Sequence, residues 1–293
     1  MTTRPDASTT PMRVGRIRYV NAYPVYGAID RGLVPFAGSL ISGVPTELNT
    51  QMAQDQLDIS VVSAVEYARD ASRYLLLPDL GITSDGPVRS VMLYSRVPAS
   101  ELSGRRVLVS RSSMTSVELL RLLFEQVWRA TPEFVPADAE VADVSHFGDV
   151  AHAARLVIGD AALLLNAARR GDAVGDHAPH YPYAYDLGAE WKQWTGLPFV
   201  FAVWVARRAV PVADALAVHA SLIASRDWGE AHRRELALDA ERSTGVDAAT
   251  CHEYLTGLEY HLGWKHLAGL SEFFRRLAAA GRVPDGGFAF LPA

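Results

Sequence analysis

The chain has 293 residues, of which 49% are hydrophobic, a formal net charge of −5 at pH 7 and a single cysteine. This length is enough to bury two hydrophobic cores, and the acidic balance argues against a nucleic-acid backbone as a partner. The lone Cys251 excludes a disulfide framework and a cysteine-based zinc site, so we expect a buried, idle thiol.

The first eleven residues, MTTRPDASTTP, are polar and hold two prolines. They lack the apolar segment of a secretory signal, and the chain shows no apolar run near the roughly 20 residues that cross a bilayer. We therefore expect residues 1–11 to be a disordered tail and the protein to be cytoplasmic, with no membrane partner.

From residue 12 onward, short apolar runs alternate with helical patterns, which is typical of an α/β fold built on mostly parallel sheets. A proline at position 45 is well tolerated at a helix start. In the first part of the chain we expect strands at residues 14–20, 39–43, 57–63, 74–77 and 88–94, and helices at 25–31, 46–56 and 64–71.

A second set of units follows a Pro- and Ser-containing crossover, SRVPASEL. It contains a strand at 105–110, a helix at 113–128, a strand, turn and helix within 156–170, and a strand and helix within 184–198. Residues 199–206 then form a near-continuous apolar strand of the kind buried on both faces, and the chain from residue 212 onward is almost all helical.

This nested order predicts two α/β lobes with a central cleft between them. We expect residues 12–95 plus 200–293 to form lobe 1 and residues 96–199 to form the inserted lobe 2. The two connections between the lobes would act as hinges near 95–98 and 198–200.

The segment SRSSMTSVELL, residues 110–120, places several hydroxyls just before a helix. Ligands of open α/β sheets bind beyond the carboxyl ends of the strands, and this segment follows a strand. The hydroxyls of Ser113, Thr115 and Ser116, with the free N–H groups of the first helical turn, would suit a carboxylate or a phosphate. A single N-cap with solvated neighbours would also explain the cluster.

Several motifs together resemble chorismate dehydratase of the futalosine route to menaquinone, over residues 13–277. They are RIRYVNAYPVY, LDISVVSAVEY, SDGPVRSVMLYSRVP, SSMTSVELLRLL, LVIGDAAL and YDLGAEWKQWTGLPFVFAVW. The resemblance implies the two-lobed fold of periplasmic solute-binding proteins. It also implies a lyase that removes water from the dianion chorismate to give 3-[(1-carboxyvinyl)oxy]benzoate, with no metal or organic cofactor.

Carried onto this sequence, the resemblance implies Asn21 and Ser90 as catalytic residues. We expect the substrate-binding residues to be Ser63, Ser113, Thr115, Ser116, Asp160 and Phe199. Among the hydroxyl and amide residues none titrates near neutral pH. We therefore favour the enolpyruvyl carboxylate of the substrate as the base that takes the proton from C3.

Other residues are also candidates for the base that takes the proton. Glu66 and Asp160 each fit a structural role at a helix start, and His146 fits a surface histidine. His177 and His180 could bind a metal but lack a third ligand. The helix spacing of Trp191 and Trp194 favours core packing.

Two other functions remain as alternatives. One is a sister lyase acting on a cyclic futalosine-type nucleoside, for which we expect a histidine base in the cleft. The other is a cytosolic anion-binding protein without chemistry. The oligomeric state stays undetermined.

Overall fold

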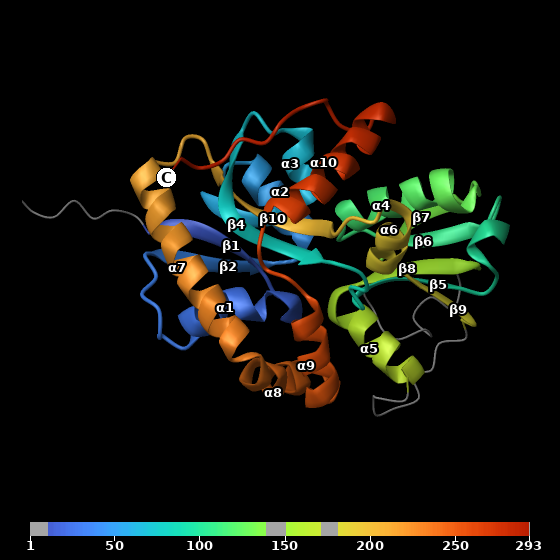
Figure 1. The fold of residues 1–293 in the computed structure, drawn as a ribbon, viewed down its shortest axis with the longest axis horizontal. Coiled ribbons are helices and arrows are strands. Elements are labelled where there is room, and N and C mark those ends of the chain that lie inside the picture. Colours follow the sequence, from blue (N-terminus) through green and yellow to red (C-terminus); the bar gives the residue numbers. More distant parts are fainter. Residues whose placement is uncertain (1–10, 139–150, 171–180, 293) are drawn as a thin grey trace, which may run out of the picture.

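Two five-stranded sheets form the centres of two lobes in the computed structural model, which describes residues 11–138, 151–170 and 181–292 (Figure 1). The predicted tail lies outside the described residues except for Pro11. In the first lobe the strand order is β2-β1-β3-β10-β4, and in the second it is β7-β6-β8-β5-β9. The first sheet comprises β1 (Met12–Ile17), β2 (Gly38–Gly43), β3 (Ile59–Ser63), β4 (Tyr74–Ser84) and β10 (Phe199–Arg207). The second comprises β5 (Val91–Ser95), β6 (Arg106–Ser110), β7 (Glu133–Ala137), β8 (Ala154–Ile158) and β9 (Tyr183–Asp186).

The two sheets are mixed rather than mostly parallel. Strands β1, β2 and β3 run parallel, as do β6, β7 and β8. In each sheet the strand that arrives from the other lobe runs against its neighbours: β10 is antiparallel to β3 and β4, and β5 is antiparallel to β8 and β9. A parallel strand needs a long crossover within one sheet, whereas these strands enter directly from the other lobe.

Helices cover both sheets and build most of the chain after residue 212. The helix α7 packs along α1 on one side of the first sheet, and α10 lies on the opposite side near α3 (Figure 1). The helices are α1 (Tyr23–Asp30), α2 (Pro45–Ala53), α3 (Ala64–Arg69), α4 (Thr115–Leu123), α5 (Gly159–Arg170), α6 (Leu187–Thr195), α7 (Val212–Ala231), α8 (Arg233–Thr244), α9 (Ala248–Gly257) and α10 (Trp264–Ala279). Shorter turns are η1 (Val20–Ala22), η2 (Ala99–Glu101) and the π-helical η3 (Phe124–Trp128), which continues α4.

The predicted boundary after residue 95 is wrong by one strand. Strand β5 already pairs with β8 and β9 in the second sheet, so the first connection between the lobes is residues 85–90. The segment 95–98, expected to be a hinge, lies within the second lobe. The second connection, residues 196–198, leads directly into β10 and agrees with the other expected hinge.

Buried side chains explain why the inner strands read as apolar runs. All residues of β3 and β5 are buried, and Trp191 and Cys251 are fully buried, as expected. Trp194 is partly buried against the core. Just before the central strand β3, the Asp58 carboxylate accepts hydrogen bonds from Arg13 Nη2 at 2.7 Å and Arg207 Nη2 at 2.6 Å, which ties β10 to β1.

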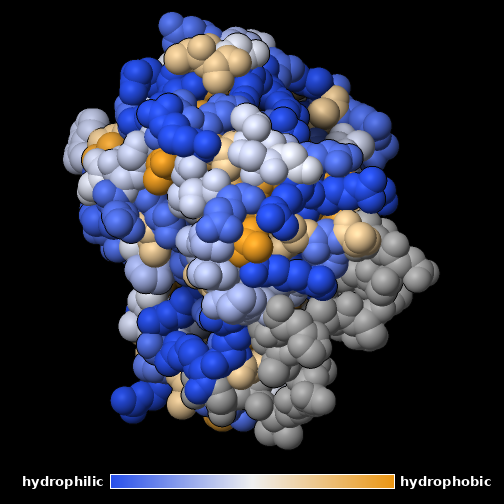
Figure 2. Space-filling view, turned by 90° about the vertical axis from the view of Figure 1, so that its right-hand side faces the viewer, coloured by the Kyte–Doolittle hydropathy of each residue, from blue (hydrophilic) through white to orange (hydrophobic). Residues whose placement is uncertain are grey.

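The outer face of the second lobe is mainly hydrophilic, with apolar side chains scattered singly over its described residues (Figure 2). Single exposed apolar residues are normal for a protein surface. Within the described parts of the chain, no helix has the length and apolar character needed to cross a membrane.

Candidate active site

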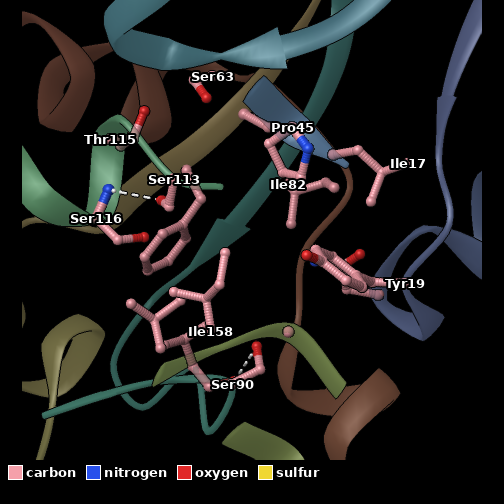
Figure 3. A pocket seen from close by; sticks show the side chains of 16 residues that line it. Ile17, Tyr19, Pro45, Ser63, Ile82, Ser90, Ser113, Thr115, Ser116 and Ile158 are labelled. Carbon is pink, nitrogen blue, oxygen red and sulfur yellow. Dashed lines mark hydrogen bonds between the residues drawn. The ribbon is translucent and has the colours of Figure 1, made fainter. Parts of the chain in front are cut away.

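A pocket lies where the two lobes meet, at the carboxyl ends of the parallel strands. Ile17 and Ser63 end β1 and β3 in the first lobe, and Ile158 ends β8 in the second. In Figure 3, Thr115 and Ser116 approach the pocket from α4, with Tyr19 on the opposite side. Six of the residues predicted for the site line this one pocket: Asn21, Ser63, Ser90, Ser113, Thr115 and Ser116.

Three of these hydroxyls each accept a hydrogen bond from a buried donor of the protein. The Ser63 oxygen accepts from Asn49 Nδ2 at 3.1 Å, and the Thr115 oxygen accepts from the Val65 N–H at 3.2 Å. The Ser90 oxygen accepts from the Tyr254 hydroxyl at 2.8 Å. A hydroxyl has one donor and two acceptor lone pairs, so an occupied lone pair leaves its proton available to a ligand.

Ser113 has a capping role as well as a place in the pocket. Its oxygen accepts from the Ser116 N–H at 3.2 Å, which satisfies one free donor of the first turn of α4 (Figure 3). The simple capping explanation therefore holds for one serine of the cluster, and Thr115 instead bonds to α3 in the other lobe. The pocket also receives the positive end of the α4 dipole.

The amide oxygen of Asn21 is available to accept a hydrogen bond from a polar ligand. Its Oδ1 atom is buried and has no hydrogen-bond partner among the described residues. A buried acceptor without a partner costs about 1 to 3 kcal/mol, so it calls for a donor that the described protein does not provide. A substrate hydroxyl would be such a donor.

The connection that carries Ser90 is held by Asp186, which also caps α6. Its carboxylate accepts from the N–H groups of Val88 at 3.0 Å and Arg89 at 2.6 Å, as well as from two N–H groups at the start of α6. Arg89 has a φ of 62°, a left-handed conformation that is strained for arginine. A side chain at Gly188 would meet the Gly86 carbonyl at 2.5 Å. The motif DLGAEW therefore fixes the backbone conformation of GPVRSV through Asp186, and the close approach of GPVRSV requires a glycine at position 188.

Tyr19 lines the pocket and was missed as a site residue, although RIRYVNAYPVY contains it. Its ring lies against Gly159, where an added Cβ would come within 3.1 Å of the ring and where φ is +65°. Only glycine meets both demands without strain. The IGD turn thus lets the two lobes approach each other beside the pocket.

Asp160 and Phe199 do not line the pocket. Asp160 lies in the first turn of α5, not at its N-cap, because Gly159 already begins the helix, and its Oδ1 accepts from the Val20 N–H at 3.0 Å across the lobes. Phe199 is fully buried against Trp191 and Phe273. Phe201, whose ring is 4.7 Å from that of Phe199, reaches the pocket instead.

Glu66, another candidate base, does not line the pocket. Glu66 lies in the first turn of α3, beside the Tyr74 hydroxyl at 3.4 Å, and burial raises the pKa of its carboxyl. His146, His177 and His180 lie outside the described residues. Among the described lining residues, the tyrosine hydroxyl of Tyr19 is the one titratable group.

These features define a class of two-lobed α/β proteins that hold a ligand between the lobes. Two connections join the lobes, and the described residues that line the pocket offer hydrogen-bond donors but no charged side chain. Solved structures confirm the fold. A protein from Archaeoglobus fulgidus matches with a TM-score of 0.73 at 19% identity, covering 93% of this chain and 98% of that one. The periplasmic aliphatic sulphonate binding protein SsuA of Escherichia coli matches with a TM-score of 0.60 at 14% identity, covering 98% and 95%.

The chain belongs to the menaquinone biosynthesis family, whose model matches residues 12–279. It is 31% identical to a chorismate dehydratase of Thermus thermophilus over 91% of this chain and 95% of the relative. It is 28% identical to a 1,4-dihydroxy-6-naphtoate synthase of Streptomyces coelicolor over 89% and 90%. The resemblance to this family found in the sequence motifs is confirmed.

Proposed function

We propose that this protein is a chorismate dehydratase, a lyase that converts chorismate to 3-[(1-carboxyvinyl)oxy]benzoate and water. The observation that carries the proposal is the pocket itself, in which the hydroxyl oxygens of Ser63, Thr115 and Ser90 accept hydrogen bonds from the protein, so that their protons can be donated to a ligand. Such a site suits a carboxylate ligand. The family and the Thermus relative support the particular substrate.

In this proposal the hydroxyls of Ser63, Thr115 and Ser116 and the start of α4 hold the ring carboxylate. Negative charge develops on that carboxylate when the vinylogous C3–H bond breaks, so donors fixed in advance stabilise the transition state. No arginine clamp is needed, because the hydrogen bonds and the helix dipole act together on the carboxylate.

The proton of C3 goes to the enolpyruvyl carboxylate of the same substrate molecule. The electron pair of that C–H bond enters the ring, the C4–O bond breaks, and the departing hydroxide takes the proton and leaves as water. The ring becomes aromatic, which supplies the driving force. Ser90 and Asn21 orient the carboxylate and the leaving hydroxyl in this step, and the described pocket offers no carboxylate or imidazole to replace the substrate as base.

The test is to incubate the purified protein with chorismate and to identify the product by mass, while the ultraviolet change on aromatisation gives the rate. The expected result is loss of 18 mass units, as one water leaves, with no added metal or cofactor. A parallel incubation with a cyclic futalosine-type nucleoside tests the alternative function as a sister lyase. Turnover of the nucleoside with chorismate left unchanged would refute the proposal.

We also propose the cytoplasm as the location, which rests on membership of a biosynthetic family.

A further inference from the structure

Tyr254 is a fully buried tyrosine outside the pocket lining, and it comes from the far end of the sequence. It lies on α9, next to α8 at the base of the molecule (Figure 1), and its side chain is 1% exposed. Its hydroxyl donates to Ser90 Oγ at 2.8 Å, a bond between residues 164 positions apart.

The direction of this hydrogen bond follows from the two groups. A phenol is a much stronger acid than an aliphatic alcohol, so the phenol is the better donor. Burial raises the pKa of Tyr254, so the phenol stays protonated and keeps its proton to donate. The Ser90 oxygen therefore accepts, and its own proton is free for another partner.

That proton has no good partner within the described protein. Ser90 Oγ lies 3.4 Å from the Val88 carbonyl oxygen, which is longer than the usual 2.5 to 3.0 Å of a bond between two oxygens. The backbone of Ser90 is held separately, because its carbonyl accepts from the Gly159 N–H at 2.9 Å. The Tyr254 bond thus decides the rotation of the hydroxyl and not the place of the backbone.

We propose that Tyr254 is a positioning residue, which holds the Ser90 hydroxyl with its proton directed into the pocket. Hydrogen bonds in a chain polarise one another, so the donation from Tyr254 also makes the Ser90 proton a stronger donor. The expected effect of Tyr254 on turnover rests on the proposed dehydration. The expected orientation of the Ser90 hydroxyl does not depend on the substrate.

The test compares Tyr254→Phe with Tyr260→Phe. Tyr260 is also fully buried, and its hydroxyl has no hydrogen-bond partner among the described residues, so the same deletion at Tyr260 is a matched control. Tyr254→Phe should lower kcat for chorismate about fivefold to tenfold, the scale of one neutral hydrogen bond, with KM changed less than about twofold. Tyr260→Phe should keep the kcat of the unchanged protein.

A second arm separates positioning from a general loss of stability. In the Ser90→Ala background, Tyr254→Phe should lower kcat no further, because the group through which it acts is gone. A full additional loss in the double variant, or a native kcat in a folded Tyr254→Phe protein, would overturn the inference.

A crystal structure of Tyr254→Phe tests the geometry without reference to the substrate. The Ser90 hydroxyl should turn and donate to the Val88 carbonyl at less than about 3.0 Å. An unchanged hydroxyl position would overturn the positioning role even if chorismate is the substrate. Failure of the unchanged protein to dehydrate chorismate would instead refute the proposed function.

Discussion

Replacement of Thr115 by valine is the clearest probe of the donor pocket. Thr115 is a buried residue, 2% exposed, and valine keeps its branched shape but removes the hydroxyl that connects α4 to α3. Two effects follow from the structure. The ligand loses a donor, and the Val65 N–H, buried in the other lobe, loses its acceptor.

The first effect concerns binding. A hydrogen bond to a charged group contributes about 1.5 to 3 kcal/mol, and each 1.4 kcal/mol is a factor of ten. Thr115→Val should therefore raise KM for chorismate roughly ten- to a hundredfold, with a smaller change in kcat, because the carboxylate is bound in both ground and transition states.

The second effect concerns folding. An unsatisfied buried N–H costs about 1 to 3 kcal/mol, so thermal or denaturant unfolding should show a less stable protein. Thr115→Ser restores the oxygen and should recover both properties in large part. Thr50→Val serves as the control, because Thr50 is exposed and its hydroxyl bonds within α2 to the Thr46 carbonyl. A folded Thr115→Val protein with the KM of the unchanged enzyme would refute the reasoning.

Other substitutions test the remaining features. Ser90→Ala and Asn21→Ala should each lower kcat about a hundredfold, the scale for a preorganised polar group, with little change in melting temperature. Glu66→Gln should keep the kcat of the unchanged protein. A folded but inactive Glu66→Gln protein would make that carboxylate the base. Gly159→Ala should destabilise the protein and impair turnover, because its φ of +65° and the tyrosine ring 3.1 Å away both oppose a Cβ; native melting and activity would contradict this. Asp58→Asn should lower the unfolding free energy at pH 7 by about 1.5 to 3 kcal/mol. Its two arginine partners hold the pKa of the Asp58 carboxyl well below its usual range, against the opposing effect of burial. The stability gained from this carboxylate is therefore present above the unfolded pKa of about 3.9 and is lost as the pH falls below it. The difference between the two proteins, measured by denaturant unfolding, should narrow below about pH 4, and a constant difference would argue against the ion pair.

Local patterns in the sequence were enough to predict the α/β class and most of the elements, although not β7 or the mixed direction of the strands. The apolar runs of β3, β5 and β10 are buried, and the helical patterns after residue 212 form α7 to α10. Hydroxyl and amide residues at strand ends were predicted to share one site, because the carboxyl ends of parallel strands meet at one edge of a sheet. Asn21, Ser63 and Thr115 do line one pocket.

Local sequence patterns could not predict contacts between distant segments of the chain. The sheet to which a strand belongs depends on its hydrogen-bonded partners, so β5 could not be assigned to the second lobe from its own residues. The apolar run likewise predicted a buried strand that includes Phe199, but not that Phe201 would line the pocket in its place. The bond from Tyr254 to Ser90 joins positions 164 residues apart, and no local signal marks it. The sequence determined which groups can donate hydrogen bonds at the ends of the strands. The tertiary structure decided which oxygens accept bonds from the protein, and so which protons remain for the ligand.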